Sequence, residues 1–175
     1  MINHLIIREM QSTDPQVMAD AFLAQGWNKP ESQYQQYLQE HLSGVRTILL
    51  AEVELQPTLF DFSGYLTIVW ESEYPPFRKE RIPEIVDFNV LIKYRRQGIG
   101  RVLMDEAEKR IALRSPIAGI GVGLTPDYGP AHILYIKRGY IPNGLGLFFN
   151  NHHLQWGETC IVNDDLTLNF TKVLR

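Results

Sequence analysis

Cysteine is almost absent from this sequence. The 175 residues contain a single cysteine, Cys160, so no intramolecular disulfide can form, and a reducing compartment is compatible with the chain. A nucleophilic cysteine needs a positioned histidine and a lowered pKa. The neighbours Thr159 and Ile161 instead predict a buried strand residue at Cys160.

Long apolar runs are also lacking. The apolar run near the N-terminus, Leu5 to Ile7, is too short for the core of a signal peptide. No stretch approaches the ~18 apolar residues that a membrane-spanning helix needs. From these absences we expect a cytoplasmic protein with no membrane partner.

Positive charge is not in excess. The formal net charge of −3 gives no support for non-specific binding of nucleic acid, which depends on clustered Lys and Arg, so we expect no nucleic-acid partner. Hydrophobic residues make up 45% of the chain and charged residues 21%, which is typical of a globular protein. The length suits one domain, and we predict that residues 1–175 form it.

Strand and helix patterns alternate along the chain. Helical spacing of apolar residues, with glycine or proline at the ends, predicts helices over residues 14–26, 30–44, 98–113 and 130–139. Asp14 is the expected N-cap of the first helix, with Pro15 after it. Apolar runs predict strands over residues 5–8, 45–53, 62–70, 84–91, 117–124, 141–149 and 166–174. Residues 71–83 are expected to be a polar loop.

The order of these elements indicates the fold class. Strand, loop, helix and strand after residue 84 are typical of a parallel crossover unit, whereas the other strands are close enough for hairpins. We therefore predict a mixed α/β (α+β) fold, in which helices cover a mixed sheet.

The most informative segment is Arg95-Arg96-Gln97-Gly98-Ile99-Gly100, between a predicted strand and a predicted helix. Helix N-termini are electropositive, glycines allow close approach of a ligand to the backbone, and Arg101 adds further charge, so the segment suits a pyrophosphate. A plain glycine-rich turn explains the glycines equally well. Position 103 is Leu103 and no G-x-x-x-x-G-K-[ST] occurs, which excludes a dinucleotide fingerprint and a nucleotide-triphosphate loop.

Two segments together resemble the GNAT superfamily of N-acetyltransferases. Arg95, Gly98 and Gly100 match R-x-x-G-x-G, the coenzyme A loop of that family. The run from Ala131 to Tyr140 looks like its A-x-x-L-Y-x-K-x-G-[FY] segment, in the family's order and separation. The resemblance implies a mostly antiparallel sheet with one parallel, splayed strand pair, and acetyl-CoA as co-substrate.

The resemblance also implies where acetyl-CoA binds. The pantetheine arm would lie in the gap between the strand that ends near Leu91 and the strand 117–124, bonded by the backbone of Phe88, Asn89 and Val90. The pyrophosphate would be held by the segment that comprises Arg95, Arg96, Gln97, Gly98, Ile99, Gly100 and Arg101. Tyr128 stands where the family often has an asparagine that contacts the coenzyme, so that contact is not assigned.

Three residues are candidates for the chemistry. In the family, a tyrosine at the position of Tyr135 lies near the thioester sulfur and can protonate the departing thiolate, although a core aromatic residue is the alternative. Glu84 is the first candidate for the base that deprotonates the amine, and Asp87 is the second. A structural alternative for Glu84 is that it lies at the solvent-exposed start of its strand, where a charge has little cost. A chain of waters could also accept the proton in place of either carboxylate.

The function implied is transfer of the acetyl group from acetyl-CoA to a primary amine of a small molecule, by direct attack in a ternary complex. Two alternatives remain open: a protein or peptide acetyltransferase, and a non-catalytic module that binds acyl-CoA. No metal site is expected, because His152 and His153 have no third ligand nearby. A homodimer is possible, since dimers are common in the family.

Overall fold

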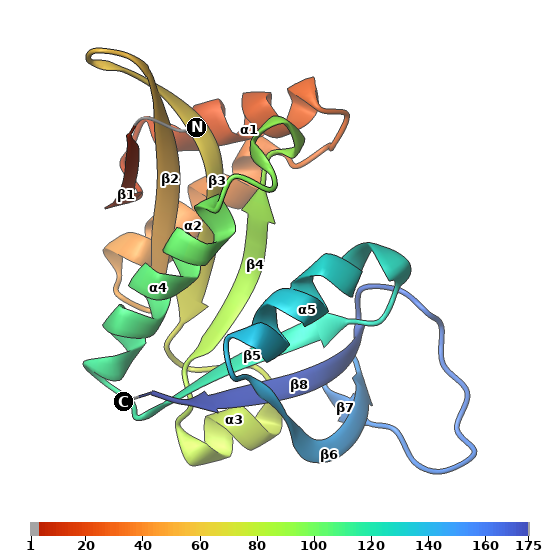
Figure 1. Cartoon of the computed structure of the whole chain (residues 1–175). Helices are drawn as coiled ribbons and strands as arrows, with labels where there is room; N and C mark the ends of the chain where they lie inside the picture. The colour runs from red at the N-terminus through yellow and green to blue at the C-terminus, as the bar shows by residue number, and fades with distance from the viewer. Residues whose placement is uncertain (1–3, 175) are drawn as a thin grey trace. The chain divides into compact units, whose positions relative to one another are not determined.

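The computed structural model describes residues 4–174, and within them the chain forms eight strands and five α-helices. The strands form a mixed, mostly antiparallel sheet with one parallel pair, flanked by helices (Figure 1), as predicted. These elements fall into two compact units. The first unit comprises the chain up to Val69 together with Val86–Lys109, and the second comprises Trp70–Ile85 and the chain from Arg110 onward.

The first unit contains three N-terminal strands, two N-terminal helices and the segment that follows the fourth strand. Its elements are β1 (Leu5–Glu9), α1 (Asp14–Ala24), α2 (Glu31–Leu42), β2 (Arg46–Gln56), β3 (Leu59–Val69), most of β4 (Glu84–Val90), the 3₁₀ turn η1 (Ile92–Tyr94) and most of α4 (Ile99–Ala112). The hydrogen-bond order is β1-β2-β3-β4. Figure 1 shows α4 in front of these strands and α1 and α2 behind them.

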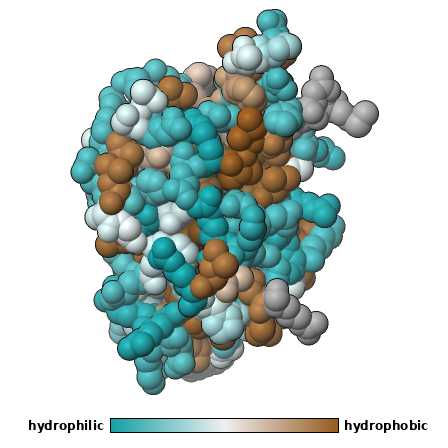
Figure 2. Space-filling model, turned by 90° about the vertical axis from the view of Figure 1, so that its left-hand side faces the viewer, coloured by the Kyte–Doolittle hydropathy of each residue, from teal (hydrophilic) through white to brown (hydrophobic). Residues whose placement is uncertain are grey.

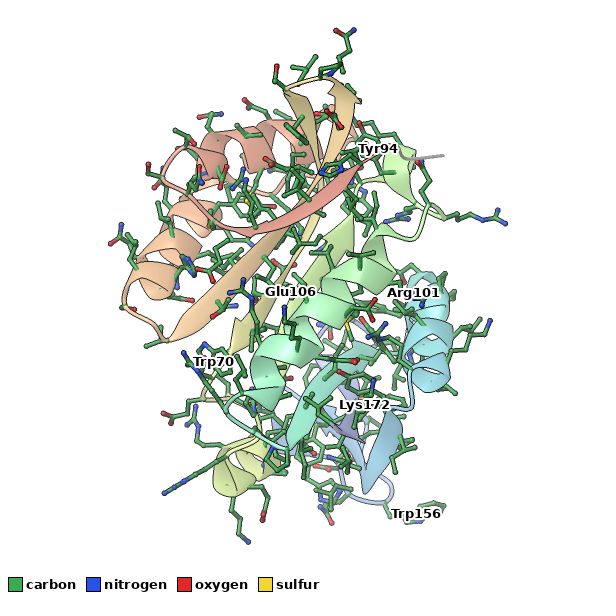
Figure 3. All side chains as sticks on the ribbon, turned by 60° about the vertical axis from the view of Figure 1, so that its left-hand side comes forward. Trp70, Tyr94, Arg101, Glu106, Trp156 and Lys172 are labelled. Carbon is green, nitrogen blue, oxygen red and sulfur yellow. The ribbon has the colours of Figure 1, made fainter. Side chains whose placement is uncertain are left out.

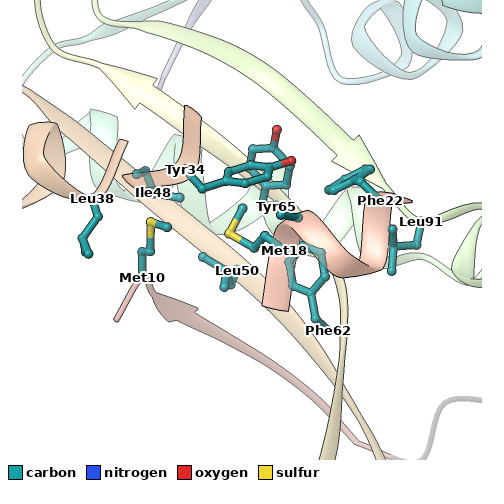
Figure 4. Close-up of a cluster of buried hydrophobic side chains, with 11 residues drawn as sticks. Met10, Met18, Phe22, Tyr34, Leu38, Ile48, Leu50, Phe62, Tyr65 and Leu91 are labelled. Carbon is teal, nitrogen blue, oxygen red and sulfur yellow. The ribbon is translucent and has the colours of Figure 1, made fainter. Parts of the chain in front are cut away.

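An aromatic core joins α1 and α2 to β2 and β3 in the first unit (Figure 4). Phe22, Tyr34 and Tyr65 are fully buried there, and their rings meet edge-on or stacked at centroid distances of 5.7 to 6.3 Å. Such ring pairs add stability beyond the area that they bury. The core therefore holds the α1–α2 connection against the face of β3 that carries Tyr65.

The second unit is built on the remaining strands and two short helices. Its elements are the first two residues of β4, α3 (Pro75–Glu80), β5 (Ile117–Gly123), the turn η2 (Pro126–Tyr128), α5 (Gly129–Lys137), β6 (Ile141–Phe149), β7 (His152–His153) and β8 (Leu166–Val173). β5, β8, β6 and β7 follow one another in antiparallel order. Glu84 and Ile85 pair with Gly119 and Ile120 of β5 in parallel, which is the parallel pair predicted from the sequence.

Three local predictions are wrong. Asp14 is not an N-cap: it lies inside α1, and its carboxylate accepts bonds from both terminal nitrogens of Arg8, at 2.7 and 2.8 Å. The predicted loop 71–83 contains α3, because Pro75 and Pro76 suit the first turn of a helix. Cys160 is a partly exposed coil residue, not a buried strand residue.

The surface seen in Figure 2 is mostly hydrophilic, with apolar residues in several separate groups. Within residues 4–174, none of the helices has the length and apolar character that crossing a membrane requires.

Candidate active site

The segment between β4 and α4 turns sharply in the first unit. Arg96 and Gly98 both have left-handed backbone conformations, with φ of 61° and 87°. Glycine adopts that conformation without strain, and an ideal Cβ at Gly98 would meet nothing within 4 Å. The Gly98 carbonyl then accepts bonds from the amides of Arg101 and Val102, at 3.0 and 3.2 Å, which starts α4. The first turn of α4 thus follows an open, glycine-containing bend.

Gly100 has a packing role. An ideal Cβ at this position would lie 3.0 Å from Cζ of Phe88 and 3.7 Å from Cγ2 of Val90. The first turn of α4 therefore packs closely on β4, and a side chain at position 100 would push the two apart. Gly98 is required by the bend and Gly100 by this contact, so the pattern of glycines has a structural cause besides any ligand.

Three arginines surround the start of α4 and are exposed. Arg95 lies with its guanidinium 5.3 Å from the Trp27 ring, and its Nε donates to the Val90 carbonyl at 3.1 Å. Arg101, on the first turn of α4 (Figure 3), is 4.0 Å from Asp105. Together with the unpaired amides that begin any helix, these guanidinium groups make the segment electropositive. The residues present therefore fit a phosphate ligand.

Phe88, Asn89 and Val90 form the end of β4, and their side chains alternate between its two faces. Phe88 and Val90 face Gly100 of α4. Asn89 lies on the opposite face, where its side-chain amide donates to Asp87 at 2.7 Å. On the β3 side the strands approach closely, since an ideal Cβ at Gly64 would lie 2.6 Å from the Asn89 carbonyl oxygen.

Asp87 is the hub of a polar cluster in the first unit. Its backbone is left-handed, with φ of 47°. Its carboxylate accepts from Lys29 Nζ at 2.8 Å, from the hydroxyls of Tyr65 and Tyr37 at 2.5 and 3.1 Å, and from Gln33 at 3.3 Å. With Asn89 this makes five donors, and a carboxylate offers about four lone-pair sites. These five donors therefore occupy the acceptor sites of the Asp87 carboxylate.

The tyrosines around Asp87 remain protonated. Burial raises the pKa of Tyr65 well above its usual value, and the Asp87 charge raises it further. Burial likewise raises the pKa of Tyr37 to about 12, again with the Asp87 charge as a second cause. Both phenols therefore act as donors to Asp87 over the ordinary pH range.

Glu84 has a different environment, in the second unit. It is buried, with 9% of its surface exposed, so the alternative that it begins its strand in solvent is wrong. Its carboxylate accepts from the Ser72 hydroxyl at 2.5 Å and from the Gly121 backbone amide. Burial raises the pKa of Glu84, although those two bonds lower it. A carboxyl group with a raised pKa and few donors is suited to accept a proton.

Further polar side chains lie close to Glu84. Tyr74 is almost fully buried, and its hydroxyl accepts from Asn143 at 2.9 Å. Burial raises the pKa of Tyr74, and the charge of Glu84 contributes to the rise. Asn169 is 2% exposed, and an ideal Cβ at Gly121 would lie 3.0 Å from its Oδ1 and 3.3 Å from a Glu84 carboxylate oxygen. Glu84 is therefore one member of a buried polar cluster.

Tyr135 lies on α5 in the second unit and is 5% exposed. Burial raises the pKa of its phenol above the usual value, and Tyr128 contributes to the rise. A phenol with a raised pKa stays protonated, so its hydroxyl can donate a hydrogen bond to a thiolate and is available as a proton donor while negative charge develops on the sulfur. Tyr128 itself covers Gly123 with its ring and donates to Asp164 at 3.0 Å, so it has a packing role at the position where the family often has asparagine.

His152 and His153 are exposed on β7, and His153 stacks on Phe148. In the part of the chain that the structure describes, no group of three or more His, Cys, Asp or Glu side chains could hold a metal ion.

Three partners of Asp87 were not predicted from the sequence: Lys29, Gln33 and Tyr65. Lys29 lies in the coil between α1 and α2, 58 positions before Asp87 in the chain. The only signal was the charge of Asp87 in an otherwise apolar strand, which requires a partner but does not identify it.

Solved structures share this fold. An N-acetyltransferase from Staphylococcus aureus Mu50 has a TM-score of 0.69 at 13% identity, and the match covers 99% of this chain and 100% of that one. A Salmonella typhimurium protein solved with its cofactor acetyl-CoA has a TM-score of 0.69 at 11% identity, covering 99% and 95%. At such identities the likeness shows the fold alone.

One curated relative bears a different description. It is the FMN-dependent NADH:quinone oxidoreductase 3 of Halalkalibacterium halodurans, 26% identical over 136 residues. These residues are 76% of this chain, and the chain spans 64% of the length of that relative.

The sequence profile described as the Acetyltransferase (GNAT) family matches residues 9–140, which is well over half of the chain. The matched range includes Glu84, Asp87, Tyr135 and the whole bend between β4 and α4. The chain therefore belongs to the GNAT family of acetyltransferases.

Proposed function

We propose that this protein transfers the acetyl group of acetyl-CoA to a primary amine of a small molecule. The observation that carries the proposal is the bend between β4 and α4, where open backbone at Gly98 is combined with the exposed guanidinium groups of Arg95, Arg96 and Arg101. A pyrophosphate is stabilised by such a helix start. The backbone amides from Arg96 to Gly100 and the guanidinium group of Arg101 would bind it, and the backbone of Phe88, Asn89 and Val90 would bind the pantetheine arm.

In the proposed reaction a neutral amine attacks the thioester directly, without a covalent acyl-enzyme. The new nitrogen–carbon bond forms as the carbon–sulfur bond breaks. Glu84 is the preferred base for the proton of the amine, because its pKa is raised by burial. Tyr135 is the preferred acid for the departing thiolate, because its phenol stays protonated. A backbone amide near Asn89 or Val90 would stabilise the oxyanion.

The finer predictions from the sequence stay predictions: a small-molecule rather than a protein acceptor, one catalytic domain, a cytoplasmic location and a homodimer.

The first test is the melting temperature with and without acetyl-CoA. A ligand at ~100 times its dissociation constant adds ~2.7 kcal/mol to the free energy of unfolding, which is a rise of several degrees for a domain of this size. NADH, ATP and FMN serve as controls, and FMN and NADH also test the oxidoreductase description of the curated relative. We expect a rise with acetyl-CoA alone; folded protein without that rise would contradict the proposal.

A matched pair of variants locates the binding site. Arg96 and Arg81 are both exposed arginines with left-handed backbones, with φ of 61° and 54°. Arg96→Ala should weaken the effect of acetyl-CoA, whereas Arg81→Ala, which loses the same charge outside the bend, should leave it unchanged. Equal responses of the two variants would argue against the bend as the phosphate site.

A further inference from the structure

The ammonium of Lys29 occupies a site that is built to bind a cation. Its Nζ lies 2.8 Å from Asp87 Oδ1 and 3.1 Å from the Tyr65 hydroxyl oxygen. It is also 5.3 Å from the centroid of the Phe22 ring and 5.5 Å from that of Tyr65. A carboxylate, a phenol oxygen and two aromatic rings are the groups that bind alkylammonium ions in proteins. We call Phe22, Tyr65 and Asp87 the Asp87 cation site.

The Asp87 cation site is held in place without Lys29. Phe22 and Tyr65 are fully buried in the core of the first unit, so their rings are fixed by packing. Asp87 keeps four other donors, namely Tyr65, Tyr37, Gln33 and Asn89. If the ammonium left, Phe22, Tyr65 and Asp87 would therefore keep their positions. In an ordinary salt bridge, by contrast, each partner helps to position the other.

Lys29 can leave more easily than its partners. It lies in the coil between α1 and α2, and its side chain is 22% exposed. Rotation about side-chain bonds would carry the ammonium into water without breaking any hydrogen bond of a helix or strand. The ammonium is thus held on a flexible side chain, whereas the groups that bind it are fixed by packing.

The Asp87 cation site also adjoins the residues assigned to the pantetheine arm. Asp87 directly precedes Phe88, Asn89 and Val90 on β4, and its left-handed backbone turns the carboxylate toward α2. We infer that the acceptor is an unbranched primary alkylamine whose ammonium binds at the Asp87 cation site, and that Lys29 is an intramolecular competitor that must leave first. The inference rests on the function proposed above.

The transfer balances as follows. The bound ammonium loses one proton to the base, its nitrogen forms a bond to the acetyl carbon, and the nitrogen then loses a second proton, which replaces the proton that the sulfur receives. The carbon–sulfur bond breaks, and coenzyme A leaves as the thiol after its sulfur is protonated. The net products are the N-alkyl acetamide, coenzyme A and one proton.

Lys29→Ala tests the competition, with n-propylamine as the acceptor because it replaces the atoms removed beyond Cβ. We expect the apparent KM for propylamine to be about tenfold lower in Lys29→Ala than in the wild type, equivalent to ~1.4 kcal/mol, with the apparent KM for acetyl-CoA unchanged. Lys93→Ala is the matched control, because Lys93 also pairs with an aspartate, at 2.6 Å, beside a tyrosine ring. Its KM for propylamine should equal that of the wild type.

A second readout does not need turnover. Propylammonium, but not n-propanol, should raise the melting temperature of Lys29→Ala, and the added substitution Asp87→Asn should abolish the rise. If acetyl-CoA stabilises the wild type but the KM for propylamine is not lowered by Lys29→Ala, or propylamine is not acetylated, the inference is overturned while acetyl-CoA binding stands. Loss of the acetyl-CoA response itself would overturn the proposed function instead.

Discussion

At the scale of single residues, the two carboxylates of β4 are three positions apart and have different surroundings. Asp87 accepts five bonds, including one from an ammonium. Glu84 is buried and accepts from a hydroxyl and a backbone amide, neither of which carries a charge. The Asp87 carboxylate is therefore held in place by its donors, whereas burial raises the pKa of Glu84.

The raised pKa of Glu84 predicts how stability depends on pH. Because the folded state holds this proton more tightly than the unfolded state, the free energy of unfolding decreases as the pH rises from about 4.5 through the folded pKa. Glu84→Gln removes the titrating group and should flatten this part of the curve. Melting temperatures of both proteins between weakly acidic and weakly basic pH measure the difference; parallel curves would contradict the raised pKa.

The same variant tests the proposed base. General bases contribute about 10²- to 10⁴-fold, so Glu84→Gln should lower kcat within that range and change its pH dependence. Asp87→Asn should instead affect mainly the KM for the amine. A Glu84→Gln enzyme with the wild-type rate and pH profile would leave a chain of waters as the proton acceptor.

Tyr135→Phe removes the proposed acid and preserves the buried ring. We expect kcat to fall about 10²-fold, with little change in melting temperature. Release of coenzyme A under saturating substrates is the measurement. Tyr94→Phe, which loses a hydroxyl that donates to Asp61, is the matched control and should keep the wild-type rate. Equal rates for Tyr135→Phe and the wild type would assign Tyr135 to the core alone.

At the scale of elements, the close approach of β3 to β4 positions the backbone that the proposed function uses. An ideal Cβ at Gly64 would lie 2.6 Å from the Asn89 carbonyl oxygen and 3.0 Å from the Val90 Cα. Both are backbone atoms, so neither can move without moving β4. Gly64→Ala should therefore destabilise the fold by about 1–3 kcal/mol and weaken acetyl-CoA binding.

Gly44→Ala is the control for that prediction. Its φ is 80° and its ideal Cβ would meet nothing within 4 Å, so alanine there should destabilise the fold by about 1–2 kcal/mol through backbone strain alone and leave acetyl-CoA binding unchanged. Denaturant unfolding and acetyl-CoA binding of the two variants give the comparison. A Gly64→Ala protein as stable as the wild type would show that β4 can shift at little cost.

Periodicity predicted the longer elements well, because apolar spacing and glycine or proline at the ends are local signals. It predicted α4 from an apolar stripe of five residues, of which four are buried and Val102 is 38% exposed; the five are Ile99, Val102, Leu103, Ala107 and Ile111. Periodicity did not predict α3, because two consecutive prolines are typical of a loop as well as of the first turn of a helix. Short elements carry too few residues for a period to be read.

The site was predictable only in part, for a related reason. The bend between β4 and α4 is contiguous in sequence, so its residues could be identified together. The burial of Glu84 depends on Ser72 and Gly121, and the Asp87 cluster depends on Lys29 and Tyr65, residues that are distant in the chain. Contacts of this kind are fixed by the folded sheet and have no local pattern.

At the scale of the whole molecule, this protein has a negative net charge, and we expect it to bind the negatively charged acetyl-CoA through a local cluster of arginines. The net charge is −3, yet Arg95, Arg96 and Arg101 lie within seven positions of one another. The Debye length falls from about 10 Å at 0.1 M salt to about 3 Å at 1 M, so exposed charges are then screened. The dissociation constant for acetyl-CoA should rise clearly over this range, as calorimetry can measure; a constant value would indicate that buried contacts dominate.

The single, partly exposed cysteine in a coil bears on the assays that measure release of coenzyme A. Reagents that detect liberated coenzyme A by its sulfhydryl group will also react with Cys160, so each progress curve should begin with an offset of up to one equivalent per chain. That offset can be used to count protein molecules by titration. The same sulfur gives a unique attachment point for a fluorophore or spin label, without any prior removal of competing thiols.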